Sequence, residues 1–172
     1  IEVLQRVVSR IVIVANAPEQ FADAGVPVLP DAVPGSGSLG GIYTALANAG
    51  GAVLILACDM PFVTAPFLAR VIEAGEDADL AIPHGRDGYQ PLCANYAPAC
   101  AGPLRRRIER GALKVVDPLA DVRVRELGPD EIAPLYGIGR VADGRPQKYL
   151  GDENSCPIRR DPTSLPSTRT RL

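Results

Sequence analysis

The chain has 172 residues, 47% of them hydrophobic, and a formal net charge of −2 at pH 7. This composition is typical of a globular protein with a core, and the acidic balance argues against general binding of nucleic acid. No apolar run is long enough to span a membrane and no basic leader with a cleavage site opens the sequence, so we expect a soluble, cytoplasmic protein with no membrane partner.

Short apolar strands alternate with helices along the first 135 residues. Helices are expected at the start of the chain and at 18–24, 42–49, 64–74 and 103–110, and strands at 11–14, 26–29, 53–57, 78–82, 91–96 and 122–127. The last of these, V-R-V-R-E-L, alternates cleanly and suits an edge strand. The alternation of strands and helices predicts an α/β fold with a doubly wound, mostly parallel, Rossmann-like sheet.

The stretch at 53–62, V-L-I-L-A-C-D-M-P-F, is the centre of this pattern. Five apolar residues without alternation predict a strand buried on both faces of the sheet. Asp59 follows at the carboxyl end of the strand, where open α/β sheets place their ligands. Asp59 could simply cap the next helix, but Thr64 already occupies a good N-cap position. Asp59 is therefore available to a hard cation that also binds phosphate oxygens.

A glycine-rich segment, Gly35-x-Gly37-x-x-Gly40, precedes that strand. It matches the dinucleotide-binding fingerprint, yet the residues D-A-V-P separate it from the preceding strand, where the fingerprint requires direct succession. The alternative is a backbone that lies against a nucleobase or ribose, with Asp31 accepting hydrogen bonds from sugar hydroxyls or guanine N–H groups. A plain flexible loop is the third interpretation.

Two further features limit the interpretation. The four cysteines form no C-x-x-C pair, which argues against zinc, and Cys58 and Cys93 stand in apolar runs that predict buried thiols. Residues 136–172 carry scattered apolar residues among Arg, Gly, Pro, Ser and Thr, which predicts a disordered tail. The expected domain therefore comprises residues 1–135.

The order of four motifs resembles that of the molybdenum cofactor guanylyltransferases. These motifs are D-x-x-P-G-x-G-S-L-G-G-I, V-L-I-L-A-C-D-M-P-F, Y-Q-P-L-C-A-N-Y and, after a helix, G-A-L-K-V-V. The likeness covers roughly residues 1–135, and the first two motifs are its most specific parts. It implies the nucleotidyltransferase (GT-A-like) version of the α/β fold.

The resemblance implies an Mg²⁺-dependent enzyme that transfers GMP from GTP to molybdopterin and releases pyrophosphate. Its further partners would be molybdoenzymes or other proteins of the cofactor pathway. Asp59 would be the catalytic residue and the metal ligand. The nucleotide would be bound by Asn16, Asp31, Gly37, Leu39, Gly40, Gly41 and Asp59, and molybdopterin by Gln90, Pro91 and Lys114.

Two family motifs are not in this sequence. They are the N-terminal strand with its L-A-G-G-x-S-x-R-M-G-x-D-K loop, and a C-terminal N-x-N-T-P-E-D segment. We therefore expect an N-terminally truncated domain that is inactive and poorly stable alone. The alternatives that stay open are a cytidylyltransferase for the same cofactor and a non-catalytic nucleotide-binding or adaptor remnant.

Overall fold

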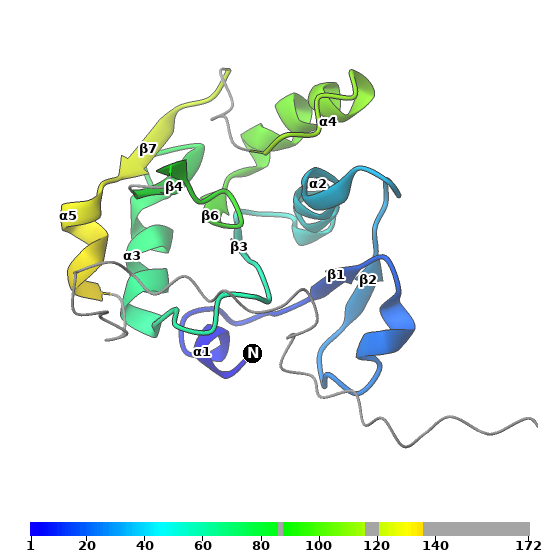
Figure 1. The fold of residues 1–172 in the computed structure, drawn as a ribbon, viewed down its shortest axis with the longest axis horizontal. Helices are drawn as coiled ribbons and strands as arrows, with labels where there is room; N and C mark the ends of the chain where they lie inside the picture. The colour runs from blue at the N-terminus through cyan, green and yellow to red at the C-terminus, as the bar shows by residue number, and fades with distance from the viewer. Residues whose placement is uncertain (86–87, 116–120, 136–172) are drawn as a thin grey trace, which may run out of the picture. The chain divides into compact units, whose positions relative to one another are not determined.

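The structure, a computed structural model, describes residues 1–85, 88–115 and 121–135 (Figure 1). The chain divides into two units, Ile1–Ile138 and Gly139–Leu172, and every element described below belongs to the first. The tail predicted at 136–172 lies outside the described residues.

Helices and strands alternate along the first unit as the sequence predicts. The α-helices are α1 (Glu2–Gln5), α2 (Gly37–Ala49), α3 (Ala65–Ala74), α4 (Ala101–Glu109) and α5 (Pro129–Ile132). The strands are β1 (Ile13–Ala15), β2 (Val28–Pro30), β3 (Val53–Leu56), β4 (Leu80–Gly85), β5 (Gly88–Tyr89), β6 (Cys93–Tyr96) and β7 (Val124–Leu127). Short 3-10 helices occupy Pro18–Phe21, Pro98–Cys100 and Ala133–Leu135. Over the described residues, no helix combines the length and hydrophobicity needed to cross a membrane.

The described strands form a mixed sheet and a small parallel pair. The mixed sheet has the order β3-β6-β4-β5, with β7 paired to β4, while β1 pairs in parallel with β2. Strands β3, β4 and β7 run in one direction, because β3 and β4 are both antiparallel to β6 and β7 is parallel to β4. The reversal at β5 and β6 follows from the connection after β4, which is too short to contain the crossover helix that parallel neighbours need.

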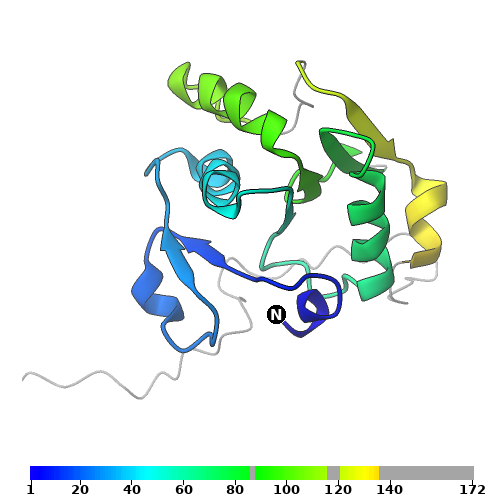
Figure 2. The same ribbon diagram turned by 180° about the vertical axis from the view of Figure 1, so that it is seen from behind.

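Helices cover both faces of the mixed sheet, which confirms the predicted α/β class. One core cluster joins α2 and α4 to Leu80 and Ile82 of β4, and the other joins α3 and α5 to Ala81. Successive residues of β4 thus point to opposite cores. Figures 1 and 2 show the same arrangement from two sides, with α2 and α4 on one side of β4 and β6 and α3 on the other.

Strand β3 is less buried than the sequence predicts. Its four residues are only half-buried, and among the described residues β6 is its one hydrogen-bonded neighbour. The strand also ends at Leu56, so Cys58 lies beyond it. The side chain of Cys58 is exposed, and the prediction that it is buried is therefore wrong. Cys93 is buried on β6 as predicted, and burial raises the pKa of its thiol to about 12.

The N-cap predicted at Thr64 is present at the start of α3. The Thr64 hydroxyl accepts a hydrogen bond from the backbone N–H of Phe67 at 3.4 Å and donates one to the carbonyl oxygen of Leu135. It therefore connects the first turn of α3 to the segment after α5. Phe67 and Leu68 of this helix are fully buried, so the cap fixes the end of a helix on which one core depends.

Replacing Thr64 by alanine is expected to lower the free energy of unfolding by about 1–2 kcal/mol, because the cap and the link to Leu135 are both lost. Urea unfolding of the purified protein measures this change. Thr64→Ser, which keeps the hydroxyl, is the matched control and should remain near the wild type. Equal stability of the alanine and serine variants would contradict the role of the cap.

Candidate functional site

The glycine-rich segment forms the first turn of α2. Helix α2 begins at Gly37, so the predicted nucleotide-binding residues from Gly37 to Gly41 are helical and the loop before them spans residues 31–36. Gly35 and Gly37 have φ values of +84° and +57°, a conformation that favours glycine. Leu39 is 1% exposed and its side chain packs in the core, which leaves only its backbone for contact with a ligand.

Asp31 is fixed against this turn by hydrogen bonds. Its Oδ1 atom accepts one from the Thr44 hydroxyl at 2.9 Å and one from the backbone N–H of Val33 at 3.0 Å. The Thr44 hydroxyl in turn accepts a hydrogen bond from the backbone N–H of Ala32 at 2.9 Å. The carboxylate lies against Gly40, where an added Cβ would be 2.7 Å from Oδ2. Asp31 and the start of α2 therefore form one structural unit.

Asn16 emerges beside Asp31. Strands β1 and β2 are parallel, and their last paired residues are Ala15 and Pro30. The next residue of each strand, Asn16 in one and Asp31 in the other, consequently leaves the same edge. The side chain of Asn16 is exposed and that of Asp31 is half-buried. Apart from Asp59, the predicted nucleotide-binding residues thus gather at the ends of β1 and β2 and at the start of α2.

The segment that leads to Asp59 lies beside Gln90 and Pro91, and these residues form a second group. The backbone N–H of Ala57, just after β3, donates to the carbonyl oxygen of Leu92 at 2.8 Å. Leu92 belongs to a tight turn closed by a hydrogen bond from the Cys93 N–H to the Gln90 carbonyl at 3.0 Å. The chain that leads to Asp59 therefore lies alongside the turn that carries Gln90 and Pro91.

Tyr96, the last residue of β6, connects the turn at Pro91 with the start of α2. Its hydroxyl donates to the carbonyl oxygen of Pro91 at 2.8 Å, and its ring packs in the same core cluster as Leu39 of α2. Val115, the residue after Lys114, packs against this cluster too. Burial raises the pKa of Tyr96, so its hydroxyl stays protonated and able to donate. The start of α2, the turn at Pro91 and the segment at Lys114 thus meet on one set of side chains.

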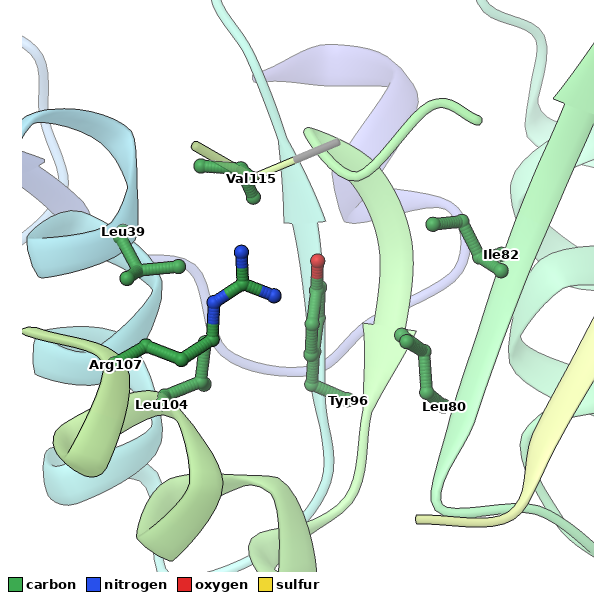
Figure 3. Close-up of a pocket in the computed structure, with 7 residues that line it drawn as sticks. All are labelled: Leu39, Leu80, Ile82, Tyr96, Leu104, Arg107 and Val115. Atoms are coloured by element: carbon green, nitrogen blue, oxygen red, sulfur yellow. The ribbon is translucent and has the colours of Figure 1, made fainter. Parts of the chain in front are cut away.

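Figure 3 shows where they meet. Tyr96 stands between Leu80 and Ile82 on one side and Leu39, Leu104 and Arg107 on the other. The guanidinium of Arg107 lies beside the Tyr96 ring, and its Nη2 atom donates to the Lys114 carbonyl at 2.5 Å. The cavity between them has a volume of about 10 Å³, which is no more than one water molecule needs. This cluster supports the site and is not itself a ligand cavity.

The carboxylate of Asp59 is an oxygen ligand of the kind that hard divalent cations bind. Its side chain is exposed, and no group of three or more His, Cys, Asp or Glu residues that could hold a metal ion occurs in the described part of the chain. A single carboxylate suits Mg²⁺, which typically binds through one or two carboxylates together with substrate phosphates and water. The residues present therefore fit a magnesium ion that arrives with a nucleotide.

Sequence reasoning missed Thr44 and Tyr96. Both are buried polar side chains whose hydroxyls hold a predicted site residue, Asp31 in one case and Pro91 in the other. The sequence did contain a signal for Thr44, which stands four residues after Gly40 and therefore on the same face of the helix. A groove of about 280 Å³ beside α3, lined by Arg70, Glu73 and Arg125 among others, contains none of the predicted site residues.

The fold and these residues define an α/β domain of the nucleotidyltransferase type. The family described as "MobA-like NTP transferase domain" matches residues 1–124, and the chain belongs to this family.

Similar proteins with a curated name support the assignment. A "Probable molybdenum cofactor guanylyltransferase" from Pelotomaculum thermopropionicum is 35% identical over 138 residues, which are 79% of this chain and 67% of the relative. A protein of the same name from Methanothermobacter thermautotrophicus is 41% identical over 98 residues, covering 54% of this chain and 50% of the relative.

A solved structure agrees with these relatives. The molybdopterin-guanine dinucleotide biosynthesis protein A of Archaeoglobus fulgidus superimposes with a TM-score of 0.63 at 30% identity, covering 72% of this chain and 65% of that one. The chain therefore spans between half and about two thirds of the length of the similar proteins described here.

Proposed function

We propose that this domain is part of a molybdenum cofactor guanylyltransferase, which transfers GMP from GTP to molybdopterin. In this reaction the terminal phosphate of molybdopterin attacks the α-phosphorus of GTP, a new P–O bond forms, and the α–β phosphoanhydride bond breaks to release pyrophosphate. One observation carries the proposal: three segments meet at the cluster around Tyr96. They are Gly37–Gly41, Gln90–Pro91 and the segment at Lys114. The names of the similar proteins indicate the same reaction.

The first group of residues would bind the guanosine. Asp31 is the hydrogen-bond acceptor at the ends of β1 and β2, and Asn16 leaves the same edge. Gly37 and Gly41 have no side chains, so a nucleoside can approach the backbone at the start of α2 closely, and the buried Gly40 makes room for the Asp31 carboxylate that would face the nucleoside. Leu39 contributes its backbone to the same surface while its side chain anchors the turn in the core.

The second group would bind the phosphates and the acceptor. Asp59 would hold Mg²⁺ together with phosphate oxygens, and the bound ion would neutralise charge that builds up on the phosphates during transfer. Gln90 and Pro91 lie on the turn beside the chain that leads to Asp59, and the exposed Lys114 can pair with the phosphate of molybdopterin. The chain's own contribution is to hold the two substrates in line for attack.

A comparison of GTP with CTP tests the proposal. The full-length protein is titrated with each nucleotide in the presence of Mg²⁺ in a calorimeter. The proposal predicts that GTP binds and that CTP competes poorly. Preferential binding of CTP would instead favour a cytidylyltransferase, and binding of NAD without any need for magnesium would favour a dinucleotide-binding protein.

A further inference from the structure

The two oxygens of the Asp31 carboxylate have different surroundings. Oδ1 accepts hydrogen bonds from the Thr44 hydroxyl and from the Val33 N–H, at 2.9 Å and 3.0 Å. A carboxylate oxygen has two lone-pair positions, so Oδ1 is fully used by the protein. Within the described part of the chain, Oδ2 accepts no hydrogen bond and lies over Gly40, 2.7 Å from where a Cβ would be.

Thr44 is built to hold this arrangement. It is 1% exposed on α2, and its hydroxyl both donates to Asp31 Oδ1 and accepts from the Ala32 N–H at 2.9 Å. The hydroxyl thus has a fixed direction, because its single hydrogen is committed to the carboxylate. The hydroxyl is held by the Ala32 N–H and in turn holds the carboxylate of Asp31. The carboxylate therefore has little freedom to rotate.

We infer that Thr44 is a positioning residue for nucleoside recognition, which holds Oδ1 of Asp31 so that Oδ2 alone is presented to the nucleoside. The inference rests on the proposed function, in which Asp31 accepts a hydrogen bond from GTP. Gly40 completes this arrangement, because a larger residue at this position would displace the Asp31 carboxylate, with its Cβ 2.7 Å from Oδ2 and 3.0 Å from Oδ1. Asp31 therefore recognises its ligand through one oxygen, and a paired contact that uses both oxygens is excluded.

The test measures GTP binding by calorimetry in the full-length gene product. Thr44→Val keeps the shape of the side chain and removes the hydroxyl, and it is expected to weaken GTP binding about tenfold, the usual effect of losing a hydrogen bond to a charged group. Thr44→Ser keeps the hydroxyl and should restore binding. In an Asp31→Asn background, Thr44→Val should have no further effect, because the acceptor Oδ2 that Thr44 helps to present is already replaced by an NH₂ group.

The outcomes separate the inference from the proposed function. Equal weakening by Thr44→Val with and without Asp31→Asn would show a merely structural role and overturn the inference. The inference would also be overturned if Thr44→Val bound GTP normally while Asp31→Asn alone bound it weakly. Unchanged binding in Asp31→Asn alone would remove the proposed role of Asp31 and the inference with it.

A pair of glycine variants keeps the inference testable if Thr44→Val fails to fold. Gly40→Ala places a methyl group against the Asp31 carboxylate, 2.7 Å from Oδ2, whereas an added Cβ at Gly102 makes only an ordinary contact with Arg106 at 3.6 Å. Each change lies in the first turn of a helix, Gly40 in α2 and Gly102 in α4, and Gly102 has no place in the proposed site. Gly40→Ala should weaken GTP binding and Gly102→Ala should not. Equal binding by the two variants would overturn the inference.

Discussion

Replacing Asp59 by asparagine is expected to lower the turnover of the full-length protein about 1,000-fold. The variant would hold Mg²⁺ poorly, and without the ion the transition state loses several kcal/mol of stabilisation of its phosphate charge. The amide keeps the size of the side chain and removes its charge. Asp59 is exposed and lies beyond the end of β3, so the substitution should leave the fold intact. Steady-state release of pyrophosphate measures the effect.

A matched control separates this effect from a general loss of charge. Asp77 is also exposed, but it precedes β4. Because β3 and β4 run in the same direction, Asp77 lies at the opposite edge of the sheet from Asp59. Asp77→Asn should retain wild-type turnover. If Asp59→Asn and Asp77→Asn were equally active, Asp59 would not be the metal ligand.

The second large effect is expected at Asp31. Asp31→Asn should raise the dissociation constant for GTP roughly 10- to 100-fold, the effect of losing a charged hydrogen-bond acceptor. The amide oxygen can still accept the bonds from Thr44 and Val33, while its NH₂ group takes the place of Oδ2. The variant therefore preserves the local structure and replaces an acceptor with a donor at the position that faces the nucleoside.

Calorimetry with GTP measures this change, and thermal unfolding shows whether the structure is preserved. The melting temperature should stay close to that of the wild type, in contrast to Thr64→Ala, which acts on stability. Wild-type affinity for GTP in a folded Asp31→Asn protein would show that Asp31 only supports the loop. Its hydrogen bonds to Val33 and Thr44 would then be its whole function.

Local features of the fold were predictable because their causes are local. The apolar run before Asp59 predicted β3, Thr64 predicted the cap of α3, and Gly50 ends α2 in the left-handed conformation at φ +69°. Each of these depends on the residues within a few positions along the chain.

Features that depend on distant neighbours were harder to predict. The half-buried state of β3 depends on which strands lie beside it, and the antiparallel direction of β6 depends on the hairpin at β5. Periodicity reports how apolar a strand is and does not report its neighbours.

The site residues also divide into those with local causes and those that depend on distant neighbours. Asp31 and Asp59 were predicted to follow strands, and they follow β2 and β3, whereas Gln90 was named only through the family resemblance. Their supports could not be found in the same way, because Thr44 acts on Asp31 across 13 positions and Tyr96 acts on Pro91 from inside the core. Buried hydroxyls resemble ordinary core residues until their partners are known.

We propose above that this domain belongs to an enzyme that attaches GMP to molybdopterin. The most direct measurement incubates the full-length gene product with GTP, Mg²⁺ and molybdopterin, and follows the molybdopterin-guanine dinucleotide by mass spectrometry together with pyrophosphate. We expect dinucleotide and pyrophosphate to form in equal amounts, and neither to form when Mg²⁺ is removed. Binding of GTP without formation of the dinucleotide, by a protein shown to be folded, would contradict it.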